Sequence, residues 1–116
     1  MLTLGPAKKI TIHLNEDTST STDFLYRDIF SFLLEQGVAG ATLIRPDAGF
    51  GKHHRIHYQH GGGVEGQHLP VRIEFIETPE RFAALLPDLM RLTTDGLIEA
   101  HDTTILKLAT TEPEPL

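Results

Sequence analysis

The sequence predicts an α+β fold of the ferredoxin-like type, in which the element order β-α-β-β-α-β places two helices on one face of a four-stranded antiparallel sheet. Stretches of alternating polar and apolar residues, typical of half-buried strands, are each followed by a stretch with helical apolar spacing. The two halves of the chain also align. Residues 10–12 correspond to residues 71–73, and a glycine ends each predicted helix at nearly the same offset, Gly37 and Gly96.

The first half reads as strand, helix, strand. Residues 9–14 alternate in polarity as a strand does. Residues 23–36 carry apolar side chains at helical spacing, with Asp23 or Thr22 as the N-terminal cap and a glycine directly after the helix. Residues 41–45 form the second predicted strand.

The second half repeats this order. Residues 71–75 alternate again, and Thr78 followed by Pro79 is a favourable helix start, since threonine caps the first turn and proline fits the first helical position. Pro87 lies inside the apolar stripe, so we expect a kink there or two shorter helical turns. The second glycine ends the helix, and residues 103–108 form the last predicted strand.

The alternation assigns the two faces of the sheet. The helix-covered face should bury six apolar side chains: Ile10, Ile12, Leu14, Val71, Ile73 and Phe75. The opposite face should carry polar side chains, which suits either solvent or a wet subunit interface: Thr11, His13, Arg72 and Glu74. Open edge strands in such a small sheet are often covered by oligomerisation.

The length of 116 residues predicts one domain. We expect residues 1–8 to be an N-terminal extension, residues 9–109 to be the folded domain with a long loop at residues 46–68, and residues 110–116 to be a flexible tail. The first residues contain no apolar core typical of a signal peptide, and no apolar run reaches the length of a membrane span. A cytoplasmic location is therefore expected.

Composition excludes several classes of function. A net charge of −6 disfavours a general nucleic-acid-binding surface, because neutralising phosphates requires a basic one. The absence of cysteine excludes disulfides, thiol chemistry and cysteine-based zinc sites. No arrangement of carboxylates or of a nucleophile with a base indicates catalysis, so we expect a binding protein rather than an enzyme.

The segment that follows the second strand is the candidate ligand site. Its glycines let backbone N–H groups approach an anion, its cations can neutralise one, and its phenylalanine can pack against a base. The residues concerned are Arg45, Gly49, Phe50, Gly51, Lys52 and Arg55. The alternative is that the glycines form a tight turn, Phe50 plugs the core and the cations are solvated. No nucleotide-hydrolysis or dinucleotide motif is present.

Histidines in the same segment suggest a second kind of site. His54, His57 and His60 are spaced by three residues, and imidazole is a good ligand for zinc, copper or nickel. A spacing of three alternates faces in a strand, so a metal site would need a curved loop or histidines from several subunits. The alternative is a polar loop that happens to be rich in histidine.

Several ordered stretches resemble one known family, the PII-like family of domain of unknown function 190. These stretches are GVAGATLIR at residues 37–45, GFG at 49–51, RIH at 55–57, LPVRIEF at 69–75, LPDL at 86–89 and DGLI at 95–98. The resemblance covers residues 9–108, nearly the whole chain. It differs from the usual family pattern at residues 61–70, where this chain has three consecutive glycines.

The resemblance implies a homotrimer similar to PII signalling proteins and to divalent-cation tolerance proteins. PII relatives bind adenine nucleotides in clefts between subunits, and a long loop after the second strand docks on a membrane transporter, a channel or an enzyme. It thus implies a regulatory protein with a small anionic ligand and adds His57 to the candidate ligand-binding residues. The competing hypothesis is a trimeric divalent-metal-binding protein that uses the three loop histidines.

Overall fold

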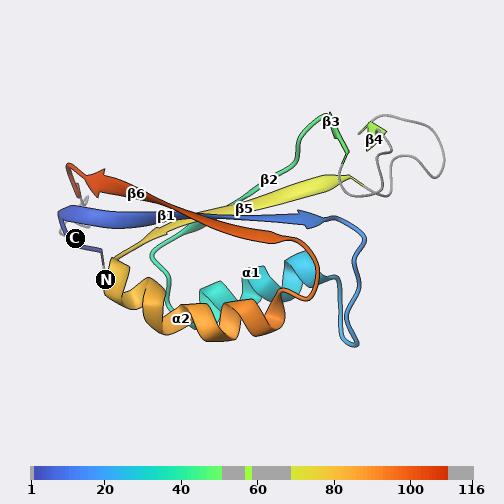
Figure 1. Cartoon of the computed structure of the whole chain (residues 1–116), viewed down its shortest axis with the longest axis horizontal. Coiled ribbons are helices and arrows are strands. Elements are labelled where there is room, and N and C mark those ends of the chain that lie inside the picture. Colours follow the sequence, from blue (N-terminus) through green and yellow to red (C-terminus); the bar gives the residue numbers. More distant parts are fainter. Residues whose placement is uncertain (1, 51–56, 59–68, 110–116) are drawn as a thin grey trace, which may run out of the picture.

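A computed structural model describes residues 2–50, 57–58 and 69–109 of the chain (Figure 1). The helices and strands, in chain order, are β1 (Gly5–Asn15), α1 (Leu25–Glu35), β2 (Ala41–Ile44), β3 (Ala48–Gly49), β4 (His57–Tyr58), β5 (Pro70–Glu77), α2 (Pro79–Leu92) and β6 (Leu97–Ile105).

The main sheet has four strands in the order β2-β5-β1-β6, and each neighbouring pair is antiparallel. Figure 1 shows α1 and α2 side by side beneath one face of this sheet. The predicted ferredoxin-like architecture is therefore confirmed. Within the segment predicted as a loop, β3 and β4 pair as a separate two-stranded ribbon, with Ala48 opposite Tyr58 and Gly49 opposite His57.

The core lies between the sheet and the two helices, as the alternation predicts. All six strand residues assigned to this face are at most 4% exposed. Helix α1 contributes Leu25, Tyr26, Ile29 and Leu33, and α2 contributes Phe82 and Leu89. Burying each large apolar side chain stabilises the fold by about 1.5–3 kcal/mol. This core therefore fixes the sheet and the helices from which the loops extend.

Two strands begin well before their predicted first residue. β1 begins at Gly5, so residues 5–8, predicted to belong to an N-terminal extension, are strand residues that pair with β6. β6 covers Leu97–Ile105, whereas the sequence placed it at residues 103–108. It is an edge strand whose side chains are mostly half-exposed or exposed, so the alternation that marks a half-buried strand is weak there.

The helix starts show one correct and one wrong prediction. Thr78 caps α2, and its hydroxyl accepts the N–H of Arg81 at 3.3 Å. α1 instead begins after Phe24, with no side-chain cap, so neither Thr22 nor Asp23 is the cap. Asp23 uses its carboxylate on the adjacent N–H of Phe24, at 2.7 Å. That short local turn replaces the capping bond that reaches two or three residues into a helix.

The helix ends differ as well. Gly37 follows α1 with φ +74°, the left-handed conformation predicted for it. Helix α2 ends earlier, at Leu92, and Gly96 (φ +118°) lies at the entry to β6. Pro87 does not divide α2 into two shorter turns, because the helix is continuous from Pro79 to Leu92. Pro87 is exposed, so the carbonyl group that loses its helical partner can be hydrated.

Over the described part of the chain, neither helix is long and apolar enough to cross a membrane.

Candidate functional site

The chain segments that form the candidate site meet at one end of the sheet (Figure 1). β1 ends there, β2 passes into the candidate segment, and β5 and α1 begin there. Glu16, the first residue after β1, donates its backbone N–H to the carbonyl of Leu69 at 2.8 Å, which extends the β1–β5 pairing beyond the strands themselves. Arg45 is the first residue after β2. The sheet thus fixes the backbone at both of these charged residues.

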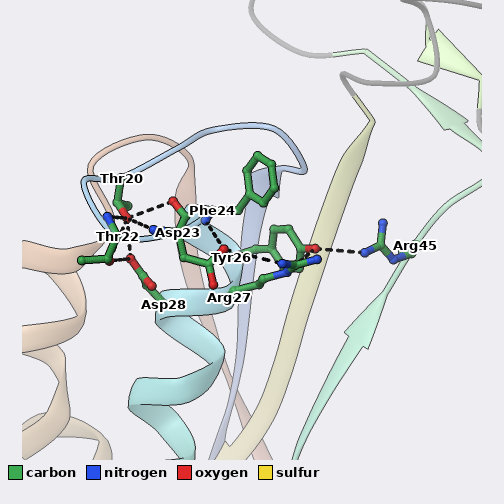
Figure 2. A network of polar contacts seen from close by, with 8 residues as sticks. All are labelled: Thr20, Thr22, Asp23, Phe24, Tyr26, Arg27, Asp28 and Arg45. Carbon is green, nitrogen blue, oxygen red and sulfur yellow. Dashed lines mark hydrogen bonds and ion pairs between the residues drawn. The ribbon is translucent and has the colours of Figure 1, made fainter.

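Arg45 is bound on two sides. Its Nη1 donates to the carboxylate of Glu16 in an ion pair, and its Nη2 donates to the Tyr26 hydroxyl at 3.2 Å (Figure 2). The guanidinium carbon also lies 5.5 Å from the centre of the Tyr26 ring, in the range of a cation–π contact. The Glu16 hydrogen bond raises the pKa of Arg45, while partial burial opposes this shift. Arg45 therefore remains a fixed positive charge.

Tyr26 is the centre of a small cationic cluster. Its side chain is in the core, with 5% of the residue exposed, and its hydroxyl also accepts a hydrogen bond from Nε of Arg27 at 3.1 Å. Arg27 lies over both the Phe24 and Tyr26 rings, at 5.5 and 5.6 Å, and its Nη1 is 3.6 Å from a carboxylate oxygen of Asp23. Two guanidinium groups thus contact one phenol oxygen, so they lie close together (Figure 2).

The loop that carries Glu16 is held on α1 by polar contacts. The Thr20 hydroxyl donates to Oδ2 of Asp28 at 2.6 Å, and that of Thr22 donates to the same oxygen at 3.2 Å (Figure 2). The N–H of Leu25 donates to the carbonyl of Thr18 at 2.7 Å. Because Asp28 is in the first turn of α1, its carboxylate also suits the positive end of the helix dipole.

Gly49 is required by close packing. A Cβ built at this position would lie 2.6 Å from Cγ of Pro70, the first residue of β5. Gly49 is part of the β3–β4 ribbon rather than of the tight turn considered as an alternative. Phe50 is 62% exposed, so it does not plug the core.

The structure therefore brings two of the candidate ligand residues, Arg45 and Gly49, to the same end of the sheet. For His57 it describes the backbone only, as part of β4. Gly51, Lys52 and Arg55 lie outside the described residues, and so do His54 and His60 of the proposed metal site. Within the described ranges, no group of three or more histidine, aspartate or glutamate side chains could hold a metal ion. Metal binding by the three histidines stays a prediction.

Sequence reasoning missed the residues that hold Arg45. Glu16 and Tyr26 belong to no motif of charge or spacing, and Tyr26 reads only as one more apolar position of α1. Their one signal is position, since Glu16 follows a strand and Tyr26 lies in the first helical turn. The order of the strands in the sheet decides which strand ends lie close together. The contacts of Arg45 with Glu16 and Tyr26 could therefore be identified only once the fold was known.

Comparisons with known proteins agree with this architecture. The model of the DUF190 family, described as an uncharacterized ACR, matches residues 7–105, most of the chain.

Solved structures of the same fold include CPII, a nitrogen regulatory PII-like protein from Thiomonas intermedia K12. Its structure bound to ADP, AMP and bicarbonate has a TM-score of 0.65 at 20% identity and covers 92% of this chain and 94% of that one. Its structure bound to ADP and bicarbonate has a TM-score of 0.62 at 20% identity, covering 92% and 95%.

A putative PII-like signalling protein from Thermus thermophilus is similar to the chain as well. Its TM-score is 0.62 at 16% identity, with 90% of this chain and 94% of that one covered. At these sequence identities the similarity to solved structures establishes the fold, and the match to the family model establishes family membership. This chain belongs to the DUF190 family and has the PII-like form of the ferredoxin-like fold.

Proposed function

We propose that this protein is a non-enzymatic regulator of the PII-like type, which binds a small anionic ligand, an adenine nucleotide, next to Arg45. The single observation that carries this proposal is the Arg45 site. The guanidinium group of Arg45, at the end of β2, is oriented by a buried tyrosine of α1, and four residues later Gly49 brings the backbone close to Pro70 of β5. The structures of CPII with ADP, of the same fold, supply the ligand class.

Arg45 and Gly49 supply complementary parts of an anion site. A guanidinium group offers several N–H donors in a planar arrangement that fits phosphate oxygens. A glycine leaves the neighbouring backbone N–H groups accessible to a phosphate. The remaining predicted ligand residues, Phe50, Gly51, Lys52, Arg55 and His57, follow directly in the chain. We place the ligand where this segment meets a neighbouring subunit of a homotrimer.

Regulation follows from the position of the site. Residues 46–68 start at the residue after Arg45, so a ligand bound there changes the conformations available to that segment. We propose that the segment engages or releases a partner in the cytoplasm, such as a membrane transporter or channel. The coupling is limited by the difference in ligand affinity between the two states of the segment, typically about 1–3 kcal/mol.

Titration calorimetry with AMP, ADP, ATP and cyclic dinucleotides tests the proposal. We expect at least one of them to bind, and we expect Arg45→Ala and Arg55→Ala each to weaken binding by about tenfold or more, because hydrogen bonds to charged groups contribute about 1.5–3 kcal/mol. Arg91→Ala is the matched control. It removes an exposed arginine of α2 that pairs with Asp88 and contacts neither Glu16 nor Tyr26, and it should leave the affinity unchanged.

Oligomeric state is measured in the same samples by light scattering. If the trimer is intact and none of these nucleotides binds, the proposal is wrong.

A further inference from the structure

The proposed anion site already contains an anion. The carboxylate of Glu16 forms an ion pair with Arg45, the cation to which we assign the ligand. We propose that Glu16 is an internal competitor: it occupies Arg45 in the absence of ligand, and an incoming phosphate group must displace or share it. This inference rests on the proposed function and adds to it the element that sets the affinity and selects the class of anion.

Glu16 is built into this position rather than placed there by chance rotation of a surface side chain. Its backbone is tied to β5 through the hydrogen bond from its N–H to the carbonyl of Leu69. Its side chain is 28% exposed and that of Arg45 is 39% exposed, so the pair is partly shielded from water. Partial shielding makes the interaction stronger than that of a fully solvated pair.

Arg45 has a second anchor that does not depend on Glu16. The hydroxyl of Tyr26 accepts a hydrogen bond from Nη2, and the guanidinium also lies over the Tyr26 ring. Since Tyr26 belongs to the core, it stays in place when Glu16 moves away. The exchange therefore replaces one anion by another on a stationary cation, and only the Glu16 side chain has to change its conformation.

Competition of this kind selects among ligands. A monocarboxylate offers Arg45 the same charge and the same two oxygens as Glu16, and it lacks the advantage of being attached to the chain. A terminal phosphate carries a charge of about −1.5 to −2 and three acceptor oxygens, so it can outcompete the carboxylate. The geometry thus favours ligands with a terminal phosphate, such as nucleoside mono- and diphosphates, over small carboxylic acids.

The test compares two isosteric variants of the wild-type chain by calorimetry with ADP. Glu16→Gln removes the competing charge, and we expect ADP to bind about three- to tenfold more tightly, the range expected for a partly shielded ion pair. Asp102→Asn is the matched control, because it removes one negative charge from an ion pair with Lys8, which lies on β1 eight residues before Glu16. At about 3.3 Å per strand residue this pair is roughly 25 Å from Glu16, so its effect should be less than about twofold at 0.15 M salt, where charges beyond about 8 Å are screened.

Two further measurements separate competition from a general change in structure. Adenosine lacks the phosphates, so its affinity should be the same in wild type and Glu16→Gln. In an Arg45→Gln background, Glu16→Gln should no longer strengthen ADP binding, since the two effects are coupled through the ion pair.

The outcomes are distinguishable. If wild type binds ADP and Arg45→Ala weakens it, but Glu16→Gln changes the affinity no more than Asp102→Asn, the inference is wrong and the proposed function stands. Weaker ADP binding in Glu16→Gln would make Glu16 a ligand contact and would overturn the inference as well. ADP binding that is detected only in Glu16→Gln, while wild type binds another of the nucleotides, would support it. No binding of any nucleotide to either protein would overturn both proposals.

Discussion

The two halves of the molecule solve the same problem, joining a strand to a helix, in different ways. In the second half, β5 ends at Glu77 and α2 begins at Pro79, so Thr78 alone connects and caps them. In the first half, residues 16–24 separate β1 from α1, and the helix begins without a side-chain cap. The connection in the second half is a single residue. The first half uses its extra residues to pair Glu16 with Arg45 and to form the polar contacts with Asp28 at the start of α1.

The largest expected effect concerns the glycines that follow the two helices. In Gly96→Ala the new Cβ would lie 2.3 Å from the carbonyl oxygen of His13 and 3.0 Å from Leu14, on a backbone with φ +118°. We expect a loss of about 3 kcal/mol or more in the free energy of unfolding, because a backbone clash adds to an unfavourable conformation. Gly37→Ala meets only Arg81, at 3.7 Å, and should cost about 1–2 kcal/mol. Urea denaturation of both variants measures the difference; equal losses would contradict this contrast between the halves.

A smaller effect is expected at the two helix starts. Thr78→Ala removes the hydroxyl that accepts the N–H of Arg81 and should destabilise the protein by about 1 kcal/mol. Thr22→Ala removes an exposed hydroxyl that contacts Asp28 and caps nothing, so its cost should be at most about 0.5 kcal/mol. Thermal unfolding of the two variants at equal protein concentration decides the matter. Should Thr22→Ala cost as much as Thr78→Ala, the first connection would be as tightly built as the second.

The smallest effect is expected where the halves meet on the uncovered face of the sheet. Oε1 of Glu99 on β6 lies 3.4 Å from Nε2 of His13 on β1 and 3.5 Å from that of His101. The hydrogen bond with His13, followed by that with His101, lowers the pKa of Glu99 below its ordinary value of 4.5. A lowered folded-state pKa means that the carboxylate stabilises the folded protein above about pH 4.5, and that this contribution is lost as the pH falls through the folded-state pKa.

Glu99→Gln should therefore weaken the dependence of stability on pH below 4.5. Glu35→Gln, which alters an exposed glutamate of α1, serves as the control. Unfolding curves recorded between pH 3 and pH 7 test this expectation, and a Glu99→Gln variant with the wild-type slope below pH 4.5 would contradict it. The effect is small because both Glu99 and its histidine partners are in contact with solvent.

The strands and helices of the core were predictable because alternation and helical spacing reflect burial on one face. Ile10, Ile73 and Leu89 are buried for that reason, and Thr78 caps α2 because its hydroxyl acts within one turn. The edge strand β6 was misplaced because its side chains are mostly half-exposed or exposed and leave no clear alternation. Asp23 is of a residue type that often caps helices, but its carboxylate accepts the N–H of its own neighbour Phe24, a local choice between two backbone donors.

The candidate site was predictable only in part. Gly49 could be selected because it lies in a segment that the scaffold does not need, and Arg45 because it directly precedes that segment; the fold places both at one end of the sheet. The pairing of Arg45 with Glu16 and Tyr26 joins three elements that are far apart in the sequence, and it depends on β2 and β1 lying on either side of β5. Local patterns do not contain that information.

The strand order has a consequence for how the chain acquires its structure. In the main sheet, β1 pairs with β5 and β6, and β2 pairs with β5, so every ladder joins a strand of the first half to a strand of the second. Neither repeat can satisfy the backbone hydrogen bonds of its own strands. During synthesis on the ribosome, the backbone groups of β1 have no strand partner until β5 has emerged, and β1 gains its second neighbour only when β6 follows. Such long-range pairing predicts slow folding for a chain of this size, and it makes the duplicated repeats a single interlocked unit.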